Sequence, residues 1–264
     1  KSDLIILAAR PSVGKTTLAL DIARNAATQH GKSVAIFSLE MSANQLTQRM
    51  LAAESKVNAW KLRTGKLTAE QDFSALRDAL NELSKAKIFI DDQAGNSIMK
   101  MKSVSRKMKS EHGLDLIVVD YLQLMMTSKN HDSMVNQVTE ISRSLKGLAR
   151  ELDVPVLALS QLSRAVESRG GKPRLSDLRD SGSIEQDADV VMFIHREDRA
   201  GNTRSDTEST GMTEVLIEKH RNGPLGKADL YFDEKNSTFM SIENHMQGYV
   251  AATQSGADSA FNDF

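Results

Sequence analysis

The feature that most constrains this chain is a phosphate-binding loop near its first residues. An apolar run at residues 4–8 precedes the loop, residues 9–16, and a helical pattern follows at residues 18–26. In such a strand–loop–helix, backbone N–H groups bind phosphate oxygens, a lysine contacts the β- and γ-phosphates and a hydroxyl ligates Mg²⁺. The predicted binding residues for ATP and Mg²⁺ are Ser12, Val13, Gly14, Lys15, Thr16 and Thr17.

Ala9 departs from the general form of this loop, which has glycine at its first position. Alanine fits there only if its φ angle is negative, so we expect the first turn to differ slightly from the usual one. The alternative is a chance Gly-Lys-Thr sequence. It is disfavoured because the strand, the loop and the helix follow in the order that the motif requires.

Short apolar runs alternate with helical patterns along most of the chain. The predicted strands are residues 4–8, 34–38, 88–90, 116–119, 156–159 and 190–194. The clearest helix, residues 134–152, has one apolar face made of Val135, Val138, Ile141, Leu145, Leu148 and Leu152. Ser42 and Gln45 form a capping box at the start of another helix, and Trp60 is interpreted as a packing residue. This order predicts an α/β fold whose mainly parallel sheet is covered by helices on both faces.

The pattern changes after Ile194. Residues 214–218 and 228–232 alternate in polarity around a turn at 222–226, which predicts a C-terminal β-hairpin. Residues 245–264 are too poor in apolar side chains to form a core and predict a flexible tail, so residues 1–244 are expected to form one domain. Because the chain opens directly on a strand, we interpret it as a fragment that lacks an N-terminal domain and linker.

Composition limits the classes of function. The apolar runs are too short to cross a bilayer, so no membrane contact is expected. The absence of cysteine excludes a disulfide framework, a thiolate metal site and a cysteine nucleophile, and it suits a cytoplasmic location. The net charge is −1, so binding of nucleic acid would need a local basic surface.

Polar residues at strand ends are the candidates for chemistry, because open α/β sheets bind ligands beyond the carboxyl ends of their strands. Asp120 and Asp91 compete for the Mg²⁺-holding role, and Asp120 is favoured because it follows the longer, purely aliphatic run. Glu40 is either the base that activates the attacking water or a solvated acid before a helix. Gln161 is either a γ-phosphate contact or an exposed loop amide.

Six ordered segments resemble the C-terminal domain of the DnaB-type replicative helicases of bacteria and their phages. They are residues 9–16, 37–41, 120–124, 160–162, 177–189 and 219–224, and the likeness runs from about residue 3 to residue 243. Helicases of this family commonly carry alanine at the position of Ala9. The resemblance implies a RecA-like P-loop ATPase that assembles as a homohexamer, with ATP between subunits and DNA in the central hole.

The resemblance also implies roles for individual residues. It assigns the phosphate and Mg²⁺ contacts to Lys15 and Thr16, and the role of catalytic carboxylate to Glu40. Asp120, in preference to Asp91, is the carboxylate that acts on Mg²⁺ through another ligand, and Gln161 is the γ-phosphate contact. Lys219 and Arg221 resemble the catalytic pair that enters the site of the neighbouring subunit. Without the resemblance, this pair would be interpreted as a solvated hairpin edge.

DNA contacts are expected in the segment before and within residues 177–189. Arg179, Asp180 and Gly182 match the loop with which these helicases hold single-stranded DNA. The preceding basic residues are Arg164, Arg169, Lys172 and Arg174. Such a run suits phosphate contact, although taken alone it is also typical of a solvated loop. Few aromatic residues accompany it, so we expect contacts with the DNA backbone.

The function expected from the resemblance is ATP-driven translocation on single-stranded DNA, in the 5′ to 3′ direction, with unwinding of duplex at the replication fork. Expected partners are a helicase loader and a primase, the latter mainly through the missing N-terminal domain. Two alternatives remain at this point. One is a recombinase-like strand-exchange ATPase on the same fold, and the other is a nucleotide-gated loading factor.

Overall fold

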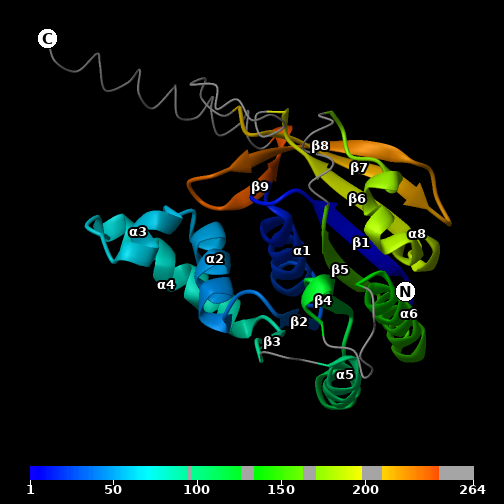
Figure 1. Ribbon diagram of the computed structural model, residues 1–264. Coiled ribbons are helices and arrows are strands. Elements are labelled where there is room, and N and C mark those ends of the chain that lie inside the picture. Colours follow the sequence, from blue (N-terminus) through cyan, green and yellow to red (C-terminus); the bar gives the residue numbers. More distant parts are fainter. Residues whose placement is uncertain (94–96, 126–133, 163–170, 198–209, 244–264) are drawn as a thin grey trace, which may run out of the picture.

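Residues 1–93, 97–125, 134–162, 171–197 and 210–243 are described by the computed structural model, with backbone alone for residues 134 and 179–183. They form one sheet of nine strands (Figure 1) in the order β3-β2-β4-β5-β1-β6-β7-β8-β9. The strands are β1 Leu4–Ala9, β2 Val34–Ser38, β3 Ile88–Asp91, β4 Leu116–Asp120, β5 Val156–Gln161, β6 Val190–His195, β7 Met212–His220, β8 Gly226–Asp233 and β9 Thr238–Ser241. The predicted mainly parallel α/β sheet is confirmed.

The helices follow the expected alternation with the strands. They are α1 Lys15–Thr28, α2 Ala43–Ser55, α3 Ala59–Thr64, α4 Glu70–Lys85, α5 Ile98–His112, α6 Met134–Leu152 and α8 Gly182–Asp187, with 3₁₀ turns η1 Leu122–Leu124 and η2 Leu175–Ser181. None of the helices in the described ranges is long and apolar enough to span a bilayer.

The sheet has a parallel part and an antiparallel part. Strands β3, β2, β4, β5, β1 and β6 pair in parallel. Strands β7, β8 and β9 extend the sheet beyond β6 with antiparallel pairing. The predicted hairpin corresponds to β7 and β8. The sequence prediction missed β9, which is only four residues long.

Both faces of the parallel part are buried, because successive residues of a strand point to opposite faces. Leu4, Ile6 and Ala8 of β1 belong to the core cluster that includes α5 and α6, while Leu7 and Ala9 belong to the cluster that includes α1 and α2. The helices therefore cover the two faces as the strand–helix alternation predicts.

Two helix predictions can be compared with the structure in detail. The capping box is confirmed, since the Ser42 hydroxyl accepts from the Gln45 amide at 3.4 Å and the Ser42 amide donates to Gln45 Oε1 at 3.0 Å. Helix α6 buries Val138, Ile141 and Leu145, as its periodicity predicts. The prediction was wrong for Val135, which is 44% exposed, because it lies in the first turn of the helix.

Candidate functional site

The loop between β1 and α1 has the backbone shape of an anion site. Gly14 caps α1 with a φ angle of 108°, and Ser12 has a φ angle of 62°. Ala9 is not among the residues with positive φ, in agreement with the expectation from its side chain. The Leu18 amide donates to the Gly14 carbonyl at 2.9 Å, so the first amides of α1 before Leu18 have no acceptor within the helix. Such amides bind phosphate oxygens readily.

The loop is supported by the C-terminal strands. A Cβ atom at Gly14 would lie 2.8 Å from Phe239 Cζ, which shows that β9 packs directly on the loop. The Asp21 carboxylate fixes this contact by accepting from the Phe239 amide at 2.7 Å and from the Thr238 hydroxyl at 3.0 Å. Burial raises the pKa of Asp21, and the hydrogen bonds and the charge of Arg24 oppose this effect. The last described strand thus holds the phosphate-binding loop in place.

Lys15, Thr16 and Asp120 meet at the carboxyl end of β4. The Thr16 hydroxyl donates to Asp120 Oδ2 at 2.7 Å, and Lys15 Nζ lies 4.0 Å from Asp120 Oδ1. Asp120 is 2% exposed, and its Oδ1 atom has no hydrogen-bond partner among the described atoms. Lys15 Nζ also lies 4.5 Å from the centre of the Tyr121 ring. Asp91, the competing carboxylate, ends the edge strand β3, which β2 separates from β4.

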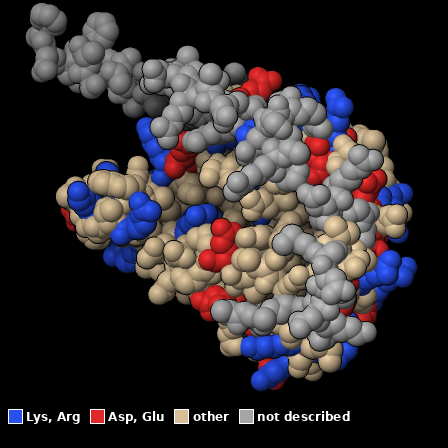
Figure 2. All heavy atoms as spheres, viewed as in Figure 1, with Lys and Arg blue, Asp and Glu red and all other residues tan. Residues whose placement is uncertain are grey.

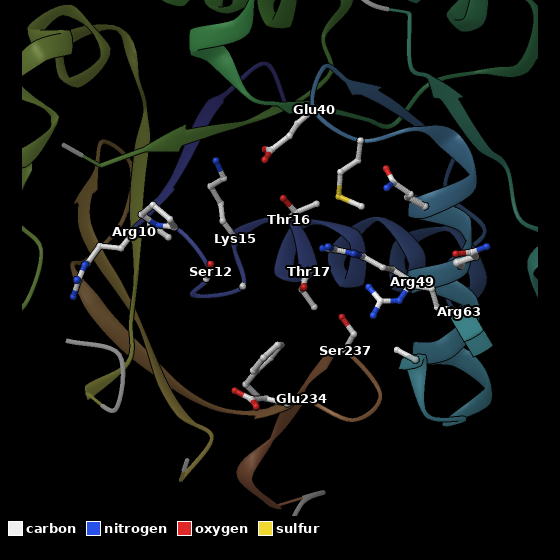
Figure 3. A pocket seen from close by; sticks show the side chains of 18 of the residues that line it. Arg10, Ser12, Lys15, Thr16, Thr17, Glu40, Arg49, Arg63, Glu234 and Ser237 are labelled. Atoms are coloured by element: carbon white, nitrogen blue, oxygen red, sulfur yellow. The ribbon is translucent and has the colours of Figure 1, made fainter. Parts of the chain in front are cut away.

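Glu40 and Gln161 line the same pocket as Lys15 and Thr16. The pocket has a volume of about 670 Å³ and lies at the carboxyl ends of β1, β2 and β5. Both side chains are exposed, as a solvated acid and a loop amide would be, but both line the pocket. Figure 3 shows the Glu40 carboxylate and the Lys15 ammonium pointing toward one another. The pocket therefore brings together a cation, a hydroxyl, an exposed carboxylate and an amide.

The charges in the pocket interact through a partly buried environment. Burial lowers the pKa of Lys15, while the Asp120 and Glu40 carboxylates oppose this effect. Burial also lowers the pKa of Arg49, and the Asp120 and Glu40 carboxylates oppose this effect as well. Burial and the two carboxylates together raise the pKa of the Tyr121 hydroxyl. An anionic ligand in the pocket would favour the charged forms of Lys15 and Arg49.

The pocket also contains residues that the sequence analysis did not identify. Arg49 of α2 and Arg63 of α3 direct their guanidinium groups into the cavity (Figure 3). Trp60 was predicted to be a packing residue, and this is wrong, because it is 51% exposed and lines the pocket. The available signal for Arg49 was its place in α2, the helix that follows the carboxyl end of β2. No local signal indicated Glu234 or Ser237, which reach the pocket from the turn between β8 and β9.

Lys219 and Arg221 do not line this pocket. The start of β1 pairs with Val190, and Val190 pairs with His220, so the two cations lie beside the opposite end of the strand. The four-residue step from Ile5 to Ala9 corresponds to about 13 Å along the sheet. Both side chains donate to α8, from Lys219 Nζ to Glu185 O at 2.5 Å and from an Arg221 guanidinium nitrogen to Gln186 O at 2.6 Å.

The residues predicted to contact DNA are only partly described. Arg164 and Arg169 lie outside the described residues. The backbone positions of Arg179 and Asp180 are in η2, and Gly182 begins α8. Lys172 Nζ donates to Glu214 Oε1 at 2.8 Å, and the Arg174 amide donates to Asp177 Oδ2 at 2.7 Å. On the face shown in Figure 2, basic and acidic side chains are interspersed among the described residues.

Comparison with known proteins gives consistent matches. The model of the DnaB-like helicase C terminal domain matches residues 1–241. The chain is 53% identical over 245 residues to the replicative DNA helicase DnaB of Geobacillus stearothermophilus and 51% identical to the replicative DNA helicase DnaC of Bacillus subtilis. Each match covers 92% of this chain and 53% of the relative, so the chain spans about half the length of these curated relatives.

Two solved structures are similar in fold as well as in sequence. One, described as an ATPase domain, superposes with a TM-score of 0.85 at 40% identity, covering 91% of this chain and 85% of that one. The other, a DnaB-like replicative helicase solved in a study of its interactions with primase, has the same TM-score and identity and covers 91% of this chain and 57% of its own.

Proposed function

Because this chain belongs to the DnaB-like helicase C-terminal domain family, we propose that it is the ATP-driven motor of a replicative DNA helicase. The single observation that carries this proposal is that Lys15 and Thr16, which contact the buried Asp120, line the same pocket as Glu40. A phosphate-binding loop, a hydroxyl held by a buried carboxylate and a second, exposed carboxylate are the groups that ATP hydrolysis requires.

The residues at the end of β4 fit a Mg²⁺ ion. Asp120 has a buried carboxylate oxygen without a hydrogen-bond donor among the described atoms, next to the Thr16 hydroxyl. Oxygen ligands of this kind suit Mg²⁺, which usually keeps several waters and binds through one or two protein groups. The Thr16 hydroxyl would hold the ion and Asp120 would orient that hydroxyl. When bound, Mg²⁺ neutralises charge on the β- and γ-phosphates.

The other pocket residues have distinct roles in the proposed reaction. The amides at the start of α1 and the Lys15 ammonium bind the β- and γ-phosphates, with Ser12, Val13 and Gly14 completing the loop and Thr17 in the first turn of α1. Glu40 orients the attacking water and accepts its proton. Gln161, at the end of β5, contacts the γ-phosphate. Negative charge on the phosphate keeps Lys15 protonated, against the effect of its burial.

The two cations that the resemblance assigns to catalysis lie outside the pocket of their own chain. Lys219 and Arg221 lie at the far end of β1 and cannot reach the pocket of their own chain. We propose that they enter the pocket of the next subunit in a homohexameric ring, where they stabilise the charge of the transferring phosphoryl group. An arginine in this role raises the hydrolysis rate by about 10³- to 10⁵-fold.

Single-stranded DNA is the proposed polymer in the central hole. The contacts would come from Arg179, Asp180 and Gly182, with Arg164, Arg169, Lys172 and Arg174 binding phosphates in the preceding segment. Sequential hydrolysis around the ring would move these contacts along the strand and exclude its complement. We further propose a helicase loader and a primase as partners and the bacterial cytoplasm as the compartment. The proposal of a primase partner is supported by the structural neighbour, a DnaB-like replicative helicase whose interactions with primase were studied.

Mixing two inactive variants tests the shared pocket. Lys15→Ala removes a phosphate contact from the chain that binds ATP, and Arg221→Ala removes the cation that acts on the neighbour. In rings assembled from equal amounts of both, about one interface in four combines an intact Lys15 with an intact Arg221. ATPase activity with single-stranded DNA should therefore recover in part. Absence of recovery at every mixing ratio, with ring assembly intact, would contradict the proposal.

The same preparations separate the two alternative functions. A strand-exchange ATPase would form continuous filaments on DNA, which electron microscopy distinguishes from rings. A nucleotide-gated loading factor would hydrolyse ATP slowly and respond little to single-stranded DNA. A motor should show DNA-stimulated turnover that depends on both Glu40 and Arg221.

A further inference from the structure

The two cations proposed to act on the neighbouring subunit are bound within their own chain by the last turn of α8. Lys219 Nζ donates to the Glu185 carbonyl at 2.5 Å, and the Arg221 guanidinium donates to the Gln186 carbonyl at 2.6 Å. Carbonyl oxygens in the last turn of a helix lack partners within the helix, and the helix dipole favours positive charge there. The end of α8 is therefore a suitable acceptor for both cations.

Asp189, two residues beyond α8, adds a negative charge at the same place. Its Oδ1 atom lies 3.5 Å from the Arg221 guanidinium, and its backbone carbonyl accepts from the Arg221 amide at 2.9 Å. Its Oδ2 atom accepts from Lys146 Nζ at 2.5 Å and from the Leu4 amide at 2.8 Å. Burial opposes the ionisation of Asp189, but these donors and the charges of Lys146 and Arg221 outweigh it and keep the pKa below its usual range.

The contact between Asp189 and Arg221 joins a buried carboxylate to an exposed guanidinium. Asp189 is 5% exposed and is fixed by Lys146 of α6 and by the first residue of β1. The Arg221 side chain, by contrast, is 46% exposed. Its guanidinium can therefore leave for the phosphates of an adjoining chain while Asp189 stays in place. A carboxylate and a phosphate would then compete for the same cation.

We propose that the carbonyls of Glu185 and Gln186 and the carboxylate of Asp189 form a holding site that retains Lys219 and Arg221 and competes for them with the neighbour's ATP. Asp189 is thus a positioning residue for the trans-acting pair. This inference rests on the proposed function, since it requires that Lys219 and Arg221 act on the next subunit.

The holding site is directly continuous with the segment predicted to contact DNA. Gly182 begins α8, and Gln186 is four residues later, about 6 Å along the helix axis. Helix α8 rests on α6, where Ser142 Oγ donates to Asp187 Oδ2 at 2.5 Å and Ile184 is fully buried. A displacement of the first turn of α8 by DNA would therefore move the carbonyls that retain the two cations. Release of the cations by DNA would follow from this arrangement.

Two substitutions of opposite effect test the holding site in the assembled ring. Asp189→Asn keeps an oxygen that can accept from the Leu4 amide but removes the charge that attracts Arg221. The kcat without DNA should rise about fivefold, while the DNA-stimulated rate stays near that of the wild type, so the stimulation ratio falls. Lys146→Met removes the other cation that pairs with Asp189 and leaves Arg221 as the nearest remaining cation. It should lower the kcat without DNA.

General loosening of the structure would change both variants in the same direction, so the opposite signs identify competition for Arg221. A DNA-independent kcat that is unchanged or lower in Asp189→Asn, in rings of wild-type size and thermal stability, overturns the inference. If Asp189→Asn does not assemble, Lys146→Met is the test of the holding site. A higher DNA-independent kcat in Lys146→Met then overturns the inference.

Arg221→Ala separates this inference from the proposed function. If Arg221→Ala leaves the ATPase rate intact, the shared pocket is wrong. If it abolishes the rate but Asp189→Asn raises nothing, only the holding site is wrong.

Discussion

The Thr16 hydroxyl donates a hydrogen bond to Asp120 Oδ2 at 2.7 Å and so connects the first turn of α1 to the end of β4. Strands β4 and β1 are separated by β5 in the sheet, so this bond joins residues that follow two non-adjacent strands. It fixes the rotamer of the hydroxyl and leaves the second oxygen of Asp120 facing Lys15. The function proposed for this chain depends on that orientation.

Asp120→Asn should reduce the ATPase kcat by about 10- to 100-fold, the usual effect of losing a group that orients a metal ligand. The variant should also need more Mg²⁺ for half-maximal activity, which a titration of Mg²⁺ at fixed ATP measures. Asp91→Asn is the matched control, because Asp91 ends an edge strand two positions from β4. Its kcat should stay within about twofold of the wild type. Equal losses in the two variants would contradict the role of Asp120.

Gly14→Ala should destabilise the protein and abolish nucleotide binding together. The new methyl group would meet Phe239 Cζ at 2.8 Å, and the φ angle of 108° is unfavourable for alanine. We expect a loss of about 1–3 kcal/mol in the free energy of unfolding, measured by urea titration. Gly31→Ala controls for the backbone effect, because φ there is 61° and no atom lies within 4 Å. That control should lose about 1 kcal/mol and keep its affinity for ATP.

Lys15→Met should stabilise the nucleotide-free protein while it abolishes ATP binding. Burial lowers the pKa of Lys15, which means that the folded state disfavours its charge even though Asp120 and Glu40 offset part of this effect. Replacing a buried charge by an apolar side chain of similar length should raise the free energy of unfolding by about 0.5–2 kcal/mol. Thermal unfolding without nucleotide measures this change. A lower melting temperature in Lys15→Met would show that the ion pair with Asp120 outweighs the cost of burial.

Much of the fold could be predicted because its signals are local. The apolar runs before Ala9, Asp120 and Gln161 became strands, and the capping box at Ser42 became a helix start. The phosphate-binding loop was identifiable for the same reason, since its glycine, lysine and threonine are consecutive and need only one strand and one helix around them.

The rest of the pocket depends on tertiary contacts, which a single sequence does not reveal. Arg49, Trp60 and Glu234 reach the cavity from three different elements, and none has a local motif. Trp60 was misassigned because a large aromatic residue near a leucine resembles a core position. Strand β9 was missed because its stability comes from its pairing with β8 and from Asp21 and not from its own periodicity.

His195 should make the stability of the protein depend on pH in the weakly acidic range. It is 7% exposed at the end of β6, and burial lowers its pKa, with Lys172 and Arg10 adding to the effect and Glu214 and Glu197 opposing it. As the pH falls below about 6.5, the unfolded chain binds a proton at this histidine before the folded chain does. Stability is therefore complete above that pH and decreases as the pH falls toward the folded-state pKa. In His195→Gln this contribution is absent, so urea titrations between pH 8 and pH 5 should show the wild type losing stability relative to the variant only on the acidic side. Parallel curves for the two proteins across this range would show that the imidazole is as easily protonated in the folded state as in the unfolded one.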